Sequence, residues 1–296
     1  MFKKLFNLQS DSWKIFDDIN TVTPHCVTFG ISIPSASIGD WQHTCVMLNL
    51  TLTSSLAQTD PRFRVIIAGH EKPELQIMQD ERVQFIRSHR QVPKILEDRI
   101  IDKNHKRDLA LKRHCENGAG YFMPLDADDL VHRDLVKYIL SDDNRLGYSI
   151  RRGYALDWQN RILAPVPGAW NVSFDNVCGS STIFYLQTND FINEDHPSKY
   201  KKPVFFTTSH AYWRVASQEW GRPLSDVPFP ACIYILNHSQ NLSFSKQRTH
   251  IRQNNIIENI KKHQTNDMNS ILSEFSMNPA LTSNQTQYDI HHNPGL

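Results

Sequence analysis

The chain has 296 residues, of which 40% are hydrophobic and 21% are charged, as in an ordinary soluble globular protein. Its formal net charge of +1 provides no field that attracts a charged polymer, so we expect no nucleic-acid partner. The five cysteines are scattered without a Cys-x-x-Cys pair, which is typical of reduced cytosolic thiols rather than of a disulfide framework or a zinc site.

No apolar run approaches the roughly 20 residues that span a bilayer. The segment MFKKLFNL (1–8) carries two lysines, but no long apolar stretch or cleavage site follows it, so it does not predict a secretory signal. It either packs on the domain as a helix or lies on a membrane surface as a basic amphipathic turn. The sequence therefore predicts a cytoplasmic protein, with peripheral contact at the inner face of the membrane left open.

Strands and helices alternate along the first half of the chain. Apolar, β-branched runs predict buried strands at 26–34, 63–69, 81–88 and 121–127. Apolar residues at helical spacing predict helices at 41–58, with Asp40 as its N-cap, at about 98–116 and at 132–140. This order predicts an α/β fold with a mostly parallel sheet flanked by helices on both faces.

The pattern changes in the second half. Residues 146–166 predict a hairpin that turns at Gln159-Asn160, and 178–186 predict a further strand. A helical stretch with Trp213 and Trp220 then leads into the apolar run 229–236. Because no linker or repeat interrupts the pattern, we expect one domain at 24–245, an N-terminal extension at 1–23, and a helical, partly disordered tail at 246–296.

Three carboxylates, Asp126, Asp128 and Asp129, directly follow the apolar run that ends in YFMPL. Like charges this close are costly to bury, so a cation should share them. Ligands bind at the carboxyl ends of parallel strands, and residues two apart on an extended segment point to the same side. Asp126 and Asp128 therefore predict a site for Mg²⁺ or Mn²⁺ that presents a diphosphate. The alternative is that Asp128 or Asp129 caps the next helix.

Two other acidic motifs fit less well. A calcium-binding EF-hand loop counted from Asp126 would need a donor, a glycine and a glutamate where Leu130, Val131 and Lys137 stand, so that interpretation fails. A phosphatase with an aspartyl nucleophile usually has its Asp-x-Asp near the first strand, followed by glycine and threonine or valine. Here the motif comes after a later strand and is followed by Asp129-Leu130.

The run from Asp102 through LDADDL resembles the nucleotide-sugar half of GT-A fold glycosyltransferases, close to the family 2 type. Ile33-Pro34-Ser35 matches the turn after the family's first strand, DKNHKRDLALKR its basic helix, and CGSSTIF its acceptor strand. The resemblance covers roughly residues 24–245. It implies a single GT-A (Rossmann-like) domain that uses Mn²⁺ or Mg²⁺ to transfer a sugar, with inversion, from a nucleoside-diphosphate sugar. It favours a UDP-sugar as donor and a glycan or lipid-linked saccharide as acceptor, in bacterial surface polysaccharide synthesis.

The resemblance also assigns roles to residues. It implies three metal ligands, namely Asp126, Asp128 and His238. It implies that the nucleotide is contacted by Ile33, Pro34, Ser35, His70, Asp102, Lys106, Arg107, Asp126 and Ala127. Lys103 is expected to add a further cation at the phosphates. The family's usual acidic residue after the second strand is replaced by AGHEKPE, so either His70 or Glu71 serves there or the contact is lost.

The catalytic base and the acceptor site are less specified. The candidates for the base, in order, are Asp195, Glu194, Asp226 and His210, since a carboxylate or a histidine must take the acceptor proton. One of Trp158, Trp170, Trp213 and Trp220 is expected to stack on the acceptor sugar, although large aromatic residues also fill cores. Because the base is uncertain in this pattern, a non-catalytic nucleotide-sugar or carbohydrate-binding module on the same fold stays the alternative.

Overall fold

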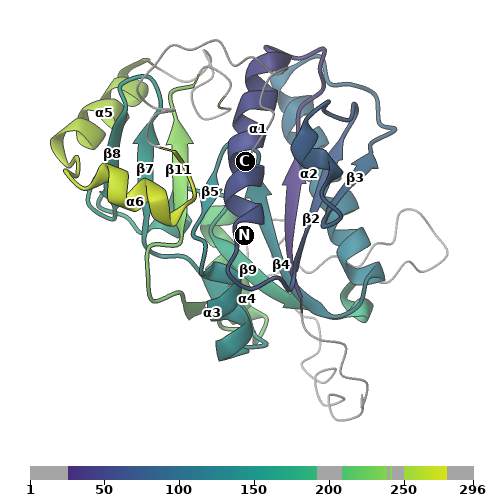
Figure 1. Ribbon diagram of the computed structural model, residues 1–296. Helices are drawn as coiled ribbons and strands as arrows, with labels where there is room; N and C mark the ends of the chain where they lie inside the picture. Colours follow the sequence, from purple (N-terminus) through teal and green to yellow (C-terminus); the bar gives the residue numbers. More distant parts are fainter. Residues whose placement is uncertain (1–25, 192–208, 239–240, 242–249, 279–296) are drawn as a thin grey trace, which may run out of the picture.

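The computed structural model of the chain describes residues 26–191, 209–238, 241 and 250–278 (Figure 1). The predicted N-terminal extension and the last residues of the tail lie outside this part. The chain forms an α/β fold, as the alternation of patterns predicts. Within the described residues, no helix combines the length and the apolar character that a membrane span needs.

A seven-stranded sheet has the order β10-β6-β9-β4-β1-β2-β3. Its strands are β1 (Val27–Ser32), β2 (Phe63–Gly69), β3 (Val83–Arg87), β4 (Gly120–Asp126), β6 (Tyr148–Ser149), β9 (Thr182–Leu186) and β10 (Ser225–Asp226). β3, β2, β1 and β4 are parallel, as expected, whereas β9 is antiparallel to both β4 and β6. The sheet is therefore mixed, but β10 is also parallel to β6, so the prediction of a mostly parallel sheet holds with β9 as the exception.

A second sheet has the order β5-β11-β7-β8 and was not predicted. Its strands are β5 (Leu130–Val131), β7 (Gly153–Asp157), β8 (Ile162–Val166) and β11 (Cys232–Leu236). The predicted hairpin is confirmed, since β7 and β8 pair antiparallel across the Gln159-Asn160 turn. β11 inserts between β5 and β7, pairing antiparallel with the first and parallel with the second.

Helices pack around both sheets (Figure 1). They are α1 (Trp41–Leu56), α2 (Leu96–Glu116), α3 (Leu135–Asp142), α4 (Trp213–Glu219), α5 (His250–Lys262) and α6 (Met268–Glu274). The predicted cap of α1 is confirmed, because the carboxylate of Asp40 accepts the backbone N–H of His43 at 3.0 Å. α2 packs against β1, β2 and β4, while α5 lies beside β7 and β8.

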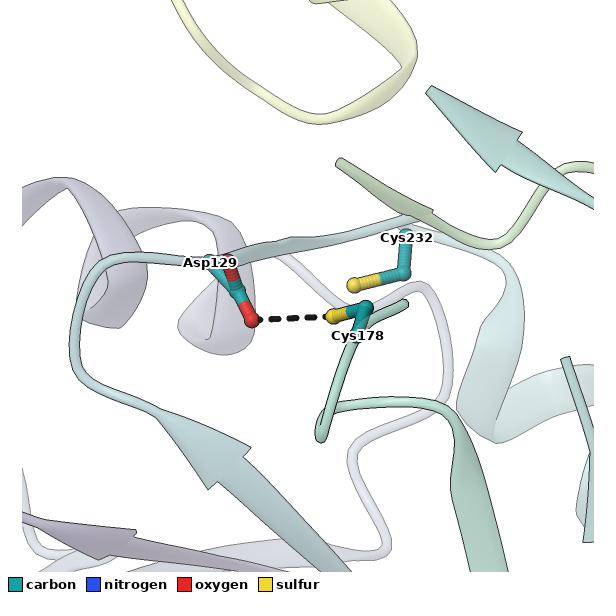
Figure 2. A group of neighbouring side chains, drawn as sticks. All are labelled: Asp129, Cys178 and Cys232. Carbon is teal, nitrogen blue, oxygen red and sulfur yellow. Dashed lines mark hydrogen bonds between the residues drawn. The ribbon is translucent and has the colours of Figure 1, made fainter. Parts of the chain in front are cut away.

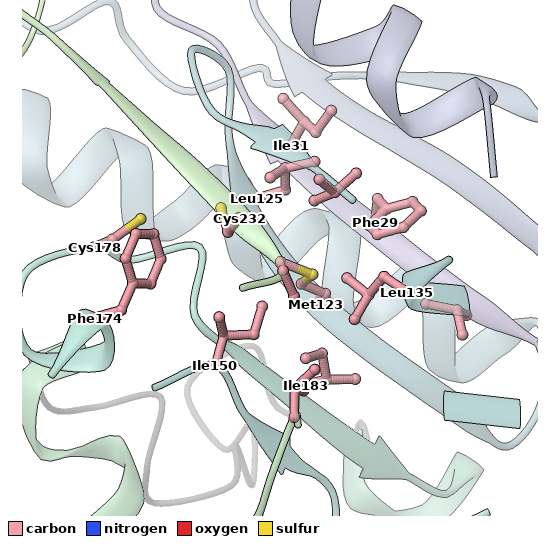
Figure 3. Close-up of a cluster of buried hydrophobic side chains, with 14 of the residues drawn as sticks. Phe29, Ile31, Met123, Leu125, Leu135, Ile150, Phe174, Cys178, Ile183 and Cys232 are labelled. Atoms are coloured by element: carbon pink, nitrogen blue, oxygen red, sulfur yellow. The ribbon is translucent and has the colours of Figure 1, made fainter. Parts of the chain in front are cut away.

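One hydrophobic core runs through the two sheets (Figure 3). Phe29 and Ile31 of β1 and Met123 of β4 belong to the same buried cluster as Cys232, at the start of β11. Ile260 of α5 joins this cluster, whereas Leu272 of α6 and Phe275 belong to a second buried cluster with residues of β7, β8 and β11. The sheets are thus held together by apolar burial, the main favourable term in folding.

His114, near the end of α2, makes the stability of this fold dependent on pH. It is buried, and its Nδ1 lies 2.8 Å from the hydroxyl of Thr28. Burial lowers the pKa of His114 to about 3. An unfolded histidine has a pKa of about 6.5, so the unfolded chain takes up the proton first as the pH falls. The contribution of His114 to the stability of the folded state is therefore complete above about pH 6.5 and is lost as the pH falls toward about 3.

We expect the free energy of unfolding to fall with decreasing pH more steeply in the wild type than in a His114→Gln variant. The difference in slope should approach about 1.4 kcal/mol per pH unit between about pH 6 and pH 4, because one fewer proton separates the two states in the variant. Urea unfolding followed by circular dichroism at several pH values measures both slopes. Equal slopes would show that His114 is not the neutral, buried group described above.

Candidate functional site

The carboxyl ends of the central parallel strands meet at one edge of the large sheet. Ser32, the last residue of β1, lies opposite Ala68 of β2 on one side and opposite Asp126 of β4 on the other. The three aspartates fill the short turn that joins β4 to β5, which the backbone bond from Asp129 N–H to the Asp126 carbonyl closes at 3.2 Å. α3 begins only at Leu135, so the interpretation of Asp128 or Asp129 as its cap is wrong.

The three carboxylates offer oxygen atoms within 4.8 Å of one another, close enough to share a metal ion. Each carboxylate has different neighbours. These neighbours explain how the fold tolerates three like charges in one turn, which unpaired burial would not allow.

Asp126 is matched by two cations from α2. Lys103 Nζ and a guanidinium nitrogen of Arg107 lie 2.9 and 3.0 Å from the same carboxylate oxygen. Burial opposes ionisation of Asp126, but Lys103 and Arg107 outweigh burial and hold the pKa of Asp126 well below its usual range. Gly179 lies so close that a Cβ there would stand 3.4 Å from the carboxylate, and the Asp126 N–H donates to Ser180 Oγ at 2.8 Å.

Asp128 faces the second sheet. His238, two residues beyond the end of β11, approaches Asp128 with its Nε2 at 2.7 Å, and the Asn241 amide donates to the same oxygen at 3.0 Å. The structure thus brings together Asp126, Asp128 and His238, the three residues that the resemblance implies as metal ligands. His43, in the first turn of α1, places its Nε2 3.1 Å from Nδ1 of His238.

Asp129 is fully buried, although one of its oxygens stays within 4.8 Å of oxygens of the other two carboxylates. Its hydrogen-bond partners are uncharged groups, among them the thiol of Cys178 at 3.2 Å (Figure 2). Burial, reinforced by Cys178 and by the charges of Asp128 and Asp126, raises the pKa of Asp129 well above its usual range. Burial therefore disfavours the charged form of the Asp129 carboxyl group.

Lys106, predicted to contact a diphosphate, is instead buried beneath the site. Its ammonium group is 1% exposed and donates to Asp102 at 2.5 Å and to the Ile33 carbonyl at 2.8 Å. Asp102 also contacts His70 Nε2 at 3.1 Å. Because these polar atoms are paired with one another and shielded from solvent, Lys106, Asp102 and His70 brace the ends of β1 and β2 rather than present charges to a ligand.

The turn after β1 is braced by the acidic residue that follows β2. Ser35 Oγ and the Ala36 N–H donate to the two carboxylate oxygens of Glu71, each at 2.9 Å. Glu71 rather than His70 therefore contacts the predicted Ile33-Pro34-Ser35 turn. Ile33 and Ser35 are buried, whereas Pro34 and Ala127 are half-buried at the site.

The structure distinguishes among the candidates for the catalytic base. Glu194 and Asp195 lie outside the described residues. Asp226 is exposed and pairs with Arg214 at 2.6 Å and with Arg151 at 3.8 Å. Its carboxylate therefore already has two cationic partners.

His210 lies within the electrostatic field of Asp126, Lys103 and Arg107. Burial lowers the pKa of His210; the charge of Asp126 opposes this shift, and Arg107 and Lys103 reinforce it. The ring also bonds the backbone of Asn176 and meets Trp213 edge-on, with centroids 6.3 Å apart. His210 is therefore a neutral imidazole beside the acidic turn at pH 7.

Of the four tryptophans considered as sugar platforms, Trp213 is 2% exposed and fills the core, so it does not serve as one. Trp158, Trp170 and Trp220 are half-buried, and the guanidinium of Arg161 covers the Trp158 ring at 4.3 Å.

His43 and Cys178 were missed by sequence reasoning. The one sequence signal for His43 was its position in the first turn of the helix that follows β1, three residues after the Asp40 cap. That position lies near the same edge of the sheet. Comparison with known proteins adds no further assignment: no protein-family model matches this chain, and no curated protein matches it.

We expect Lys106→Met to lower the free energy of unfolding by about 3–5 kcal/mol, because it leaves the buried carboxylate of Asp102 without its cation. The matched control is Lys112→Met on the same helix, whose ammonium is 38% exposed and lies 3.8 Å from Glu116. That control should cost less than about 1 kcal/mol. Urea unfolding of the three proteins makes the comparison, and equal losses would contradict the structural role of Lys106.

Proposed function

We propose that this protein is a metal-dependent glycosyltransferase that moves a sugar from a nucleoside-diphosphate sugar to a glycan acceptor. The observation that carries the proposal is the carboxylate cluster at the carboxyl end of the parallel strands, with His238 against Asp128 and with Lys103 and Arg107 against Asp126. Such a strand end is where ligands bind in open α/β sheets. Carboxylate oxygens are suitable donors for Mn²⁺ or Mg²⁺.

One group of residues would hold the metal ion, and another would contact the diphosphate directly. Asp126, Asp128 and His238 would hold the ion, which when bound would offset negative charge on the diphosphate leaving group. Lys103 and Arg107 lie one helical turn apart on α2, so they present their charges on one face. Both retain partial exposure, at 28% and 15%, and are the cations in this group that reach a ligand.

His210 is the base that this geometry favours. In a single displacement with inversion, the acceptor oxygen bonds to the anomeric carbon while the bond to the diphosphate oxygen breaks, and the acceptor proton must leave. A neutral imidazole at pH 7 can take that proton, and the lowered pKa of His210 keeps it neutral. Asp226 is less suited, because its carboxylate is already paired with Arg214 and Arg151.

One observation favours a non-catalytic binding module as the second candidate. Both oxygens of Glu71 are occupied by the turn after β1, and Asp102 is paired with Lys106 and His70. Neither Glu71 nor Asp102 is therefore open to a base or ribose. Under the first proposal the nucleotide is read by the backbone of that turn, with a UDP-sugar as the favoured donor and a glycan or lipid-linked saccharide at the inner membrane face as the acceptor.

We expect one nucleotide among UDP, GDP, CDP and dTDP to raise the melting temperature only when Mn²⁺ is present. A ligand that binds only the folded state adds about 2.7 kcal/mol of stability at a hundred times its Kd. The shift should disappear in Asp128→Ala and persist in Asp134→Ala, which changes a neighbouring carboxylate outside the turn. No shift with any nucleotide, or a shift that survives in Asp128→Ala, would overturn the proposed metal and diphosphate site.

Replacement of His210 should separate turnover from binding. We expect His210→Ala to lower kcat for transfer or donor hydrolysis by about 10²–10⁴-fold, the usual contribution of a general base, while the nucleotide-dependent thermal shift is kept. His89→Ala, which changes an exposed histidine, serves as the control. Unchanged turnover in His210→Ala would exclude it as the base, and binding without turnover in the wild type would favour the non-catalytic module.

A further inference from the structure

Asp129 belongs to two different groups of side chains that could hold a metal ion. One group contains its neighbours Asp126 and Asp128, and the other contains Cys178 and Cys232, whose thiols are buried with it (Figure 2). The proposed function uses neither Asp129 nor the two thiols. The hydrogen bonds of the Asp129 carboxyl group indicate a third role.

Protein groups surround that carboxyl group on both oxygens. The Ser180 hydroxyl lies 2.5 Å and the Cys178 thiol 3.2 Å from Oδ2, and the backbone N–H of Ile235 donates to Oδ1 at 3.4 Å. Asp129 is 0% exposed, so these bonds form without competition from solvent. Hydrogen bonds in such a setting are strong, and losing one partner leaves a buried polar group unsatisfied.

Two of these bonds lead directly to the proposed metal ligands. Ser180 Oγ, which contacts Asp129, accepts the backbone N–H of Asp126 at 2.8 Å. Ile235, which donates to Asp129, lies on β11 three residues before His238. The carbonyl of Ile235 accepts the amide of Asn241 at 3.0 Å, and the same amide donates to Asp128. Asp129 therefore connects the acidic turn of one sheet to the strand of the other sheet that supplies the histidine.

We propose that Asp129 is a positioning residue, whose buried carboxyl group holds the acidic turn and β11 at the separation that a divalent ion requires between Asp126, Asp128 and His238. The inference rests on the proposed metal site and deepens it. Neighbours of metal ligands orient those ligands, and their loss typically weakens metal binding about 10–100-fold. The thiol of Cys178 contributes a hydrogen bond to this link, while the thiol of Cys232 is hydrogen-bonded to Cys178 rather than to Asp129.

The test is the affinity for Mn²⁺ alone, measured from the electron paramagnetic resonance signal of free Mn²⁺ in titrations of the full chain. We expect the wild type to bind Mn²⁺ and Asp128→Ala to lose binding. Asp129→Ala, which removes all three hydrogen bonds of the carboxyl group, should bind about 10-fold more weakly or worse. Cys232→Ala should bind as the wild type does, because it leaves all three bonds to Asp129 in place.

Circular dichroism and melting temperature would establish that each variant is folded at the temperature of the titration. If Asp129→Ala does not fold, Ser180→Ala decides the matter, because it removes the hydrogen bond that joins Asp129 to the backbone of Asp126 and should also weaken Mn²⁺ binding. If the folded Asp129 or Ser180 variant binds Mn²⁺ with wild-type affinity, while Asp128→Ala loses binding, the positioning role alone is overturned. A wild type that binds no Mn²⁺ would overturn both the metal site and its positioning. Zinc that co-purifies with the wild type and is lost in Cys178→Ala and Cys232→Ala would show instead that Asp129 is a ligand of a thiol-bound ion.

Discussion

The repulsion between three carboxylates in a four-residue turn is the constraint on which the site depends. The fold meets it by giving each carboxylate a different environment. Asp126 lies against two cations of α2, Asp129 is hydrogen-bonded in the interior, where burial raises its pKa, and Asp128 lies against His238 and Asn241. The side chains of Asp126 and Asp128 stay partly exposed, at 18% and 22%, on the side where a metal ion and a diphosphate are proposed to bind.

This turn is also the joint between the two sheets. Asp126 ends a strand of the seven-stranded sheet, and Leu130 begins a strand of the four-stranded sheet. The second sheet brings His238 to Asp128 across 110 positions of sequence, because β11 pairs with β5 directly after the turn. The shared hydrophobic core makes this geometry rigid, since close-packed interiors do not permit the sheets to slide independently. The packing of the two sheets therefore determines where the site lies.

The elements with strong local signals were predictable from the sequence. The capped helix after β1 and the hairpin at Gln159-Asn160 follow from spacing and turn chemistry within a few residues. The second sheet was not predictable in this way, because β11 pairs with strands about 80 and 100 positions away and no local signal specifies such partners. Lys106 was misassigned for a related reason: the basic pattern of α2 shows which residues share a face, but only tertiary packing decides whether a face meets solvent or the ends of β1 and β2.

The same electrostatic constraint bears on the choice of base. A carboxylate placed near Asp126 and Asp128 would add a further negative charge to a turn that already holds three carboxyl groups within 4.8 Å of one another. An imidazole avoids this cost, because it is neutral at rest and becomes positive only when it accepts a proton. The imidazolium that forms at His210 would then be stabilised by Asp126, whose charge already raises the pKa of that ring against the effect of burial. Under the proposed function, an acidic turn that binds a cation therefore favours a histidine as its base. The positive charge that His210 gains with the acceptor proton is then attracted by the carboxylate of Asp126.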